Sequence, residues 1–216
     1  PDTRAILLYI ASIHQRRNFM SAARSAARNK PVLAIKAGRV AEGAKAAASH
    51  TGALAGSDEV YEAAIRRAGM LRVNSFEELF AAVETLARAR PLTGNRLAIV
   101  TNGGGLGVMA VDHLVHDGGQ PAQLTAETIA KLDTVLPNPW SRGNPVDIIG
   151  DAPGKRYADA LAILFDAPEV DAVVCMHAPT AITSSTDVAE KIIPLVKATP
   201  HANLMTCWVG EEMVGA

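Results

Sequence analysis

The fold is decided by the stretch Arg96-Leu-Ala-Ile-Val-Thr-Asn-Gly-Gly-Gly-Leu-Gly-Val-Met-Ala-Val-Asp-His-Leu114. A short apolar run ends in the polar residues Thr101 and Asn102, and glycines then open a segment whose apolar residues recur at helical spacing. A strand, a glycine-rich turn and a helix in this order are typical of an α/β protein. Because the start of such a helix presents free backbone N–H groups, the turn is a candidate anion-binding site.

The glycine spacing is not that of a dinucleotide fingerprint. GxGxxG is not satisfied, because Val108 occupies the place of the last small residue, and GxxxxGK[ST] is absent. The turn therefore predicts general phosphate binding. The alternative is a tight strand-to-helix turn in which glycine supplies only backbone freedom.

Apolar runs and helical patterns alternate on both sides of this stretch. The predicted strands are 5–10, 32–37, 70–73, 97–101, 146–149, 170–176 and 204–209. The predicted helices are 19–29, 57–68, 75–89, 105–116, 125–136, 157–165 and 186–197, with capping signals at Ser75-Phe-Glu-Glu78 and Thr125. Continuous apolar strands that alternate with helices favour parallel sheets covered on both faces. We expect an α/β protein of two flavodoxin-like units, each with three αβα layers.

The two units are expected to meet at Pro91-Leu-Thr-Gly94, which is typical of a linker. We place the first domain at residues 1–91 and the second at 92–216. The sequence starts directly before one predicted strand and stops just after another, without a closing helix. We therefore expect a fragment of a longer protein.

A second stretch, Ala46-Ala-Ala-Ser-His-Thr-Gly-Ala-Leu-Ala-Gly-Ser-Asp58, holds one imidazole, His50, among small residues. We interpret it as a loop directly before a helix that Ser57 or Asp58 caps. At such a position the backbone N–H groups and the helix dipole would stabilise a phosphorylated histidine. The alternative is a histidine that is merely solvated.

Composition narrows the class of protein. Hydrophobic residues make up 49% of the chain, which is enough to form a hydrophobic core. The net charge is -1, so the chain lacks the strong positive potential that favours nucleic-acid binding. The local basic run of Arg16, Arg17, Arg24 and Arg28 is interpreted as a solvated helix face. Cysteines 175 and 207 both lie in predicted strands, which favours buried thiols in a reducing compartment over a disulfide.

The sequence contains no apolar segment long enough to span a membrane and no signal-like N-terminus. We therefore expect a cytoplasmic protein without membrane or nucleic-acid partners. No metal site is expected: His113 and His116 lie three apart on a predicted helix but have no carboxylate or cysteine at ligand spacing. For His177, beyond a predicted strand, we favour a structural, hydrogen-bonded role.

Four segments in order carry a specific resemblance: Lys30-Pro-Val-Leu-Ala-Ile-Lys-Ala-Gly-Arg39, Ser49-His-Thr-Gly-Ala-Leu-Ala-Gly-Ser-Asp58, Thr101-Asn-Gly-Gly-Gly-Leu-Gly107 and Asn144-Pro-Val-Asp147. Over nearly the whole chain the sequence resembles the nucleoside-diphosphate-forming acyl-CoA synthetases, the superfamily of ADP-forming acetate–CoA ligase and succinyl-CoA synthetase. It is similar to the large synthetases, some of which carry an acetyltransferase domain and modify protein lysines.

The resemblance implies an acid–thiol ligase in which phosphorylated His50 passes phosphate between a nucleotide and an acyl phosphate, and CoA takes the acyl group. It implies phosphate binding near two helix starts, by Ser49, Thr51, Gly52, Ser57, Asp58, Asn102, Gly103, Gly104, Gly105 and Gly107. Asn144 and Asp147 would lie near the substrate, although Asn144-Pro145 is also typical of an ordinary turn.

The resemblance also implies partners. The full-length protein would use an acyl or carboxylate substrate, CoA, and ATP or ADP with Mg²⁺, together with an ATP-grasp domain in cis or in trans. The sequence has no recognisable ATP-grasp or CoA-binding GxGxxG unit, so the fragment alone is expected to be incomplete. Assembly as a homo-oligomer is compatible with the sequence.

One position departs from the family. In many relatives the first strand ends in a Tyr-apolar-acid pattern whose carboxylate orients the phosphohistidine, whereas this chain has Tyr9-Ile-Ala11. The imidazole then lacks a partner that fixes its tautomer, unless Asp58 or Glu59 substitutes. The alternative function is therefore a catalytically degenerate, acyl-CoA-sensing regulatory region of a protein lysine acetyltransferase. A generic flavodoxin-like binding domain is a third hypothesis.

Overall fold

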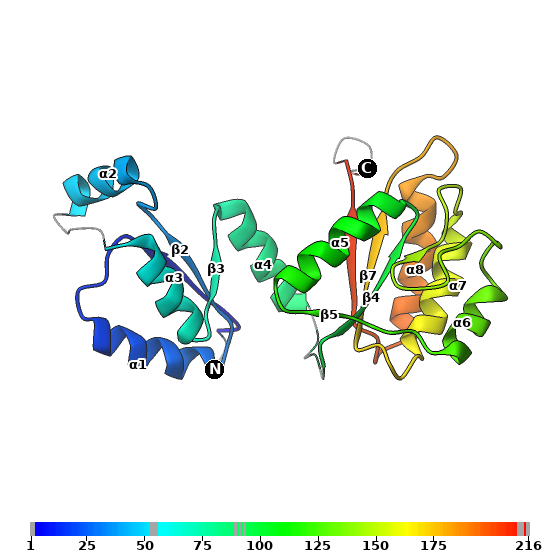
Figure 1. Cartoon of the computed structure of the whole chain (residues 1–216), viewed down its shortest axis with the longest axis horizontal. Helices are drawn as coiled ribbons and strands as arrows, with labels where there is room; N and C mark the ends of the chain where they lie inside the picture. Colours follow the sequence, from blue (N-terminus) through cyan, green and yellow to red (C-terminus); the bar gives the residue numbers. More distant parts are fainter. Residues whose placement is uncertain are drawn as a thin grey trace. The chain divides into compact units, whose positions relative to one another are not determined.

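The computed structural model describes residues 3–51, 56–88, 90, 92, 94–210 and 214, with only the backbone of residues 50 and 51. The chain divides into two compact units, Pro1–Arg88 and Ala89–Ala216, close to the expected linker. Each unit contains a parallel sheet with helices on both faces (Figure 1). The predicted α/β class and its three αβα layers are thus confirmed.

The sheet of the first unit has three strands in sequential order: β1 (Ile6–Ile10), β2 (Val32–Lys36) and β3 (Leu71–Val73). Both pairings are parallel, with Ile6 opposite Val32 and Leu33 opposite Leu71. The central strand β2 is buried along its whole length, which explains its continuous apolar run.

Helices cover both faces of this sheet. On one face α1 (Arg16–Ala27) and α3 (Asp58–Arg67) pack against Val32 and Ala34 of the central strand. On the other face α4 (Phe76–Arg88) packs against Leu33 and Ile35. The side chains of β2 therefore alternate between the two faces, as the pleat of a strand requires.

The sheet of the second unit has the strand order β5, β4, β7, β8, and β6 also pairs with β4. Its strands are β4 (Arg96–Thr101), β5 (Gln120–Pro121), β6 (Val146–Asp147), β7 (Ala172–His177) and β8 (Leu204–Trp208). All their pairings are parallel. The strand β5 was not predicted, because two residues are too short for a recognisable sequence pattern.

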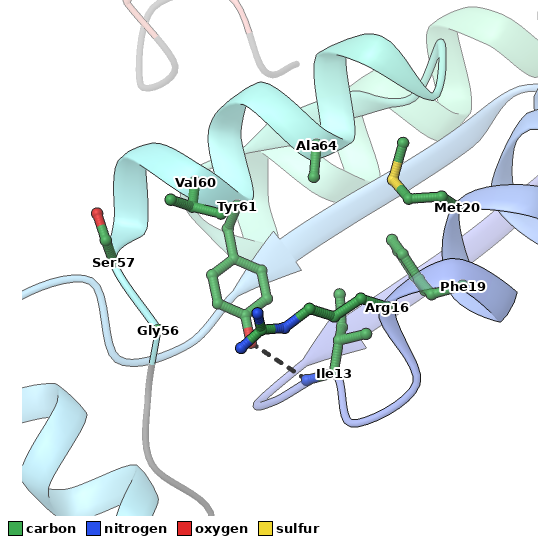
Figure 2. A pocket seen from close by; sticks show the side chains of 9 residues that line it. All are labelled: Ile13, Arg16, Phe19, Met20, Gly56, Ser57, Val60, Tyr61 and Ala64. Atoms are coloured by element: carbon green, nitrogen blue, oxygen red, sulfur yellow. Dashed lines mark hydrogen bonds between the residues drawn. The ribbon is translucent and has the colours of Figure 1, made fainter.

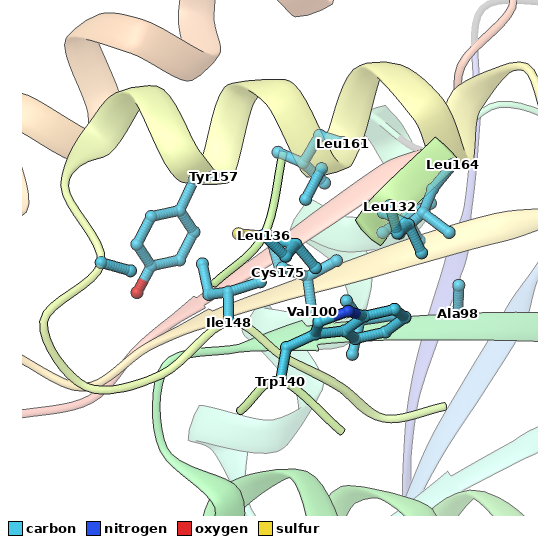
Figure 3. Packing of buried hydrophobic residues seen from close by; sticks show 14 of the residues in the cluster. Ala98, Val100, Leu132, Leu136, Trp140, Ile148, Tyr157, Leu161, Leu164 and Cys175 are labelled. Carbon is cyan, nitrogen blue, oxygen red and sulfur yellow. The ribbon is translucent and has the colours of Figure 1, made fainter. Parts of the chain in front are cut away.

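One face of this second sheet holds the larger core (Figure 3). Buried side chains of β4 and β7 pack there against α6 (Ala126–Asp133), α7 (Gly154–Phe165) and α8 (Ser185–Ala198). The opposite face is covered by α5 (Gly104–His116) (Figure 1). This arrangement brings the glycine-rich turn to the carboxyl end of β4, where parallel sheets bind ligands.

The helix-capping predictions agree with the hydrogen bonds. Thr125 Oγ1 accepts a bond of 3.2 Å from the backbone N–H of Thr128 at the start of α6. Ser75 Oγ accepts a bond of 3.1 Å from the N–H of Glu78, whose carboxylate accepts one of 2.7 Å from the N–H of Asn74. The capping box is therefore present, although the glutamate reaches one residue further back than the box pattern predicts.

The expectation of two buried thiols is half correct. Cys175 on β7 is buried, and burial raises the pKa of its thiol to about 12. Cys207 on β8 is exposed, so the prediction is wrong there, because β8 is the last strand in the order of the described sheet. Both cysteines are free thiols. Within the described parts of the chain, no helix has the length and apolar character of a transmembrane span.

Candidate functional site

The segment that carries His50 is helical and not the loop that the sequence analysis expected. Residues up to Thr51 belong to α2 (Ala41–Thr51), which contains five alanines in eleven residues. Alanine has the highest helix propensity, and this outweighs the lack of an amphipathic pattern. Gly52 and the side chains of His50 and Thr51 lie outside what the structure describes.

The start of α2 packs closely on the end of β2. Gly38 has a φ of +71°, and a Cβ there would lie 3.2 Å from the Cα of Ala44 and 3.3 Å from the Cβ of Ala47. A side chain at this position is therefore excluded both by backbone conformation and by space. This close contact holds the helix that carries His50 at the carboxyl edge of the first sheet.

Lys36, the last residue of β2, is a buried cation beside the same edge. The residue is 2% exposed, and Nζ donates to the carbonyl oxygen of Ala37 and lies 4.5 Å from the centroid of the Tyr61 ring. Burial lowers the pKa of Lys36, and the carboxylate of Asp58 opposes this shift. The side chain links the end of β2 to α3, the helix that follows the histidine segment.

Asp58 begins α3 and is held by two arginines. Arg72 Nη2 lies 2.6 Å from its Oδ1, and Arg39 Nε lies 3.8 Å from its Oδ2. Ser57 stands at the N-cap position, as predicted, but its side chain makes no capping hydrogen bond. Because the Asp58 carboxylate is engaged by Arg72, it is poorly placed to replace the acid that is missing at Ala11.

In the second unit the turn before α5 has its own internal bonds. The N–H of Gly103 donates to Thr101 Oγ1 over 3.0 Å, and the N–H of Gly107 donates to the Gly103 carbonyl over 3.2 Å. Among the described residues, the N–H groups of Gly104 and Gly105 have no such acceptor. Of the five residues predicted from this turn, these two are the candidates for holding an anion.

Gly107 has a packing role. It is buried, and a Cβ there would lie 3.0 Å from both Thr101 Cγ2 and Pro145 Cβ. Asn102 likewise joins strand ends: its amide donates to the carbonyl oxygen of Ala178 and its Oδ1 accepts from the Ala178 N–H, each over 2.8 Å. Both residues therefore position the turn, and their predicted contact with phosphate stays a prediction.

Asp147 lies directly against the start of α5. A Cβ on Gly104 would be 2.8 Å from its Oδ2, and its Oδ1 accepts a bond of 2.9 Å from the N–H of Ile149. A carboxylate at a helix start is favoured by the helix dipole. Asp147 thus lies against the glycine turn, and its predicted place near the substrate stays a prediction.

Asn144 is an internal bridge. Its Oδ1 accepts from the Ile99 N–H over 2.9 Å, and its Nδ2 donates to the carbonyl oxygens of Leu97 and Ala122 over 2.8 and 3.0 Å. All three partner groups belong to the scaffold around β4. The amide is fully engaged there, so the expectation that Asn144 contacts the substrate gains no support from its bonds.

His177, at the end of β7, is fully buried. Its Nδ1 and the hydroxyl oxygen of Tyr157 are hydrogen-bonded over 2.9 Å, and its ring packs 5.7 Å from that of Trp208. Burial lowers the pKa of His177, which favours the neutral ring. The predicted hydrogen-bonded histidine is confirmed. Within the described residues, no three His, Cys, Asp or Glu side chains come together as a metal site.

Two family models match the chain. One, described as the succinyl-CoA ligase like flavodoxin domain, matches residues 1–86, and the other, the ligase-CoA domain, matches residues 97–206. A parallel sheet with a histidine segment, followed by a second parallel sheet with a glycine turn, is consistent with this pairing. The chain belongs to the family of CoA ligases that these domains define.

Curated ADP-forming acetate–CoA ligases align with most of the chain. Acetate–CoA ligase (ADP-forming) I of Archaeoglobus fulgidus is 43% identical over 99% of this chain and 30% of its own length. The alpha subunit of acetate–CoA ligase (ADP-forming) I of Pyrococcus furiosus is 39% identical over 89% of this chain and 41% of its own. The chain therefore spans less than half the length of these curated relatives.

A solved structure shows the same fold. It is the dinucleotide-forming acetyl-coenzyme A synthetase 1 of Ca. Korarchaeum cryptofilum in complex with phosphate and ADP. The TM-score is 0.91 at 33% sequence identity, and the match covers 100% of this chain and 47% of that chain. The flavodoxin-like architecture expected from the sequence is confirmed by this match and by the family models.

The buried charged residues that contact the start of α3, Lys36 and Arg72, were not predicted from the sequence. Lys36 ends β2 and is 2% exposed as a residue, and Arg72 lies within β3 with a side chain that is 7% exposed. The available signal was a lysine at the end of an otherwise apolar strand, since lysine is rarely buried without a partner.

Proposed function

We propose that the chain is part of an ADP-forming acyl-CoA synthetase and that His50 is its phosphoryl carrier. The observation that carries this proposal is the intact Ser49–Asp58 segment, which runs from the last residues of α2 to the first residue of α3 in a unit that matches the succinyl-CoA ligase like domain. In this proposal residues 1–91 form the domain with the phosphohistidine and residues 92–216 the domain with the glycine turn.

The proposed chemistry is nucleophilic catalysis. Inorganic phosphate attacks the carbonyl carbon of the acyl-CoA thioester, so a C–O bond forms, the C–S bond breaks and CoA leaves as the thiol, which yields an acyl phosphate. A ring nitrogen of His50 then attacks the phosphorus of this acyl phosphate, so an N–P bond forms, the P–O bond to the acyl group breaks and the free carboxylate leaves. The phosphoryl group then passes to ADP, which yields ATP; the reverse direction consumes ATP. Backbone N–H groups at Ser57 and Asp58, and at Gly104 and Gly105, are the proposed donors to phosphate.

The full reaction needs more than this chain. We propose that CoA, ATP or ADP with Mg²⁺ and a carboxylate substrate bind to the complete protein, with an ATP-grasp domain in cis or in trans. Support comes from the relatives, which are ADP-forming CoA ligases, and from the solved neighbour, which holds ADP and phosphate. We also propose that the protein works in the cytoplasm and assembles as a homo-oligomer.

The test is phosphate transfer from γ-labelled ATP to the complete protein that contains this chain, scored as acid-labile protein phosphate. We expect label on the natural sequence, no label on His50→Ala, and unchanged label on the control His116→Ala, an exposed histidine of α5. Folded protein that takes no label from ATP or GTP would contradict the proposal and favour the regulatory alternative.

A substitution at Ala11 provides a second test of the proposal. If the missing carboxylate limits the reaction, Ala11→Glu will raise the rate of His50 labelling, because an acid at this place supports the charged imidazole. A rate unchanged by Ala11→Glu in a protein that does label His50 would show that another group has taken over the role.

A further inference from the structure

A pocket of about 450 Å³ opens between α1 and α3 in the first unit (Figure 2). This volume falls within the range of roughly 300–1,000 Å³ that small-molecule sites occupy. Most of its wall is apolar. The lining residues that matter for its chemistry are Ile13, Arg16, Phe19, Met20, Val60 and Tyr61.

The pocket lies at the edge of the sheet where α/β proteins bind ligands. Ile13 belongs to the connection that leaves the carboxyl end of β1, and Arg16 is the first residue of α1. Gly56 and Ser57, which also line the pocket, immediately precede α3. Carboxyl ends of parallel strands are the usual location of ligand sites.

Tyr61 is a rigidly held part of the pocket wall. Its hydroxyl accepts a bond of 3.2 Å from the N–H of Ile13, and its ring lies over the ammonium of Lys36. The phenol is therefore fixed at both ends between α3, the β1–α1 connection and β2. A fixed aromatic face beside Phe19 and Met20 suits a planar or branched apolar group.

Among the described residues that line this pocket, Arg16 supplies the only cation. Figure 2 shows its side chain extending toward the hydroxyl of Tyr61. Arg39 and Arg72 are both paired with Asp58, whereas no described carboxylate is paired with Arg16. A guanidinium without a partner above an apolar pocket is complementary to a carboxylate with an apolar tail.

We propose that this pocket binds the carboxylate substrate and that the substrate has a branched aliphatic or aromatic tail. The carboxylate would pair with Arg16, and the tail would lie against Tyr61, Phe19 and Met20. Acetate would leave most of the volume unfilled and gain little from the apolar wall. The inference rests on the proposed function, since it names the substrate class of that ligase.

The test is a titration of the 216-residue chain with phenylacetate, in which binding is measured by ligand-observed NMR and by calorimetry. We expect saturable binding of phenylacetate and no measurable binding of acetate under the same conditions. Neutral phenylacetamide should bind at least about tenfold more weakly than phenylacetate, because the loss of one charge-assisted contact corresponds to about a tenfold change in affinity. Arg16→Gln should weaken phenylacetate binding by about tenfold. Its matched control is Arg17→Gln, the next arginine on α1, which does not line the pocket.

A second variant tests the cavity itself. Ala64→Trp would fill the pocket from α3 and should abolish binding, with far-UV circular dichroism and the thermal midpoint confirming that it folds. Three results would overturn the proposal: no phenylacetate binding to the natural sequence, equal binding of phenylacetamide, or equal losses in Arg16→Gln and Arg17→Gln. The proposed function fails separately, if His50 takes no phosphate in the complete protein.

Discussion

The ammonium nitrogen of Lys36 lies 4.5 Å from the centroid of the Tyr61 ring, inside the first unit and away from solvent. This contact joins the end of the central strand to the helix that follows the histidine segment. The segment is thus bounded by two anchored elements, α2 through Gly38 and α3 through Lys36 and Arg72. A carrier histidine in such a frame would be held near the carboxyl edge of the sheet.

Tyr61→Leu is expected to destabilise the first unit by about 2 to 3 kcal/mol, because it removes the cation–π contact and leaves the Ile13 N–H without its acceptor. Tyr61→Phe removes only the hydroxyl and should cost about 1 kcal/mol. Hydrogen exchange of amides in β2 and α3 within the whole chain measures both effects. Equal protection in the two variants would show that the ring over Lys36 contributes nothing.

Gly104→Ala and Gly105→Ala form a matched pair at the start of α5. A Cβ at Gly104 would meet Asp147 Oδ2 at 2.8 Å, whereas a Cβ at Gly105 meets nothing within 4 Å. We expect Gly104→Ala to lower the stability by about 1 to 2 kcal/mol and Gly105→Ala to leave it unchanged or raise it by up to about 1 kcal/mol. Thermal unfolding checks this, and Asp147→Ala should relieve the loss in Gly104→Ala.

Asn144→Ala should destabilise the second unit by about 3 kcal/mol. The substitution leaves the Ile99 N–H and two carbonyl oxygens without their partner, and unsatisfied polar groups of this kind lose about 1 kcal/mol or more each. Asn138→Ala, in an exposed loop, is the control and should change the stability by less than about 0.5 kcal/mol. Urea unfolding measures both, and similar values would contradict the bridging role.

The second unit should lose stability in acid through Asp171. Side-chain and backbone hydrogen bonds from Arg96 hold the pKa of Asp171 at about 2, below its ordinary value of 3.8. A depressed pKa stabilises the fold above the unfolded value, and this contribution is lost as the pH falls from about 4 to about 2. Asp171→Asn should therefore unfold with a shallower dependence on pH in this window than the control Asp112→Asn. Parallel profiles of the melting temperature would rule out this linkage.

Much of the fold follows from local patterns. The apolar run of β2 predicts a strand buried on both faces, and the Thr125 and Ser75 caps predict where α6 and α4 begin. These signals act within a few residues, through backbone hydrogen bonds and side-chain periodicity. The sequence alone therefore determined the α/β class, the two units and most element positions.

The candidate site was predicted less completely. The glycine turn and its position after a strand were expected from order and spacing, whereas the close approach of Asp147 to Gly104 was not. The helical state of the His50 segment was not, because a run of alanine and other small residues has no amphipathic period. The role of Asn144 as a bridge was also invisible, since its partners lie 22 to 47 residues away in the chain.

Tertiary structure alone decided which polar groups are buried and what they meet. Lys36 became a buried cation because β2 is the central strand and Tyr61 of α3 covers its end. Cys207 became exposed because β8 ends the strand order, although its sequence is as strand-like as that of Cys175. Local sequence determines the elements, whereas burial depends on neighbours that only the packing of distant segments supplies.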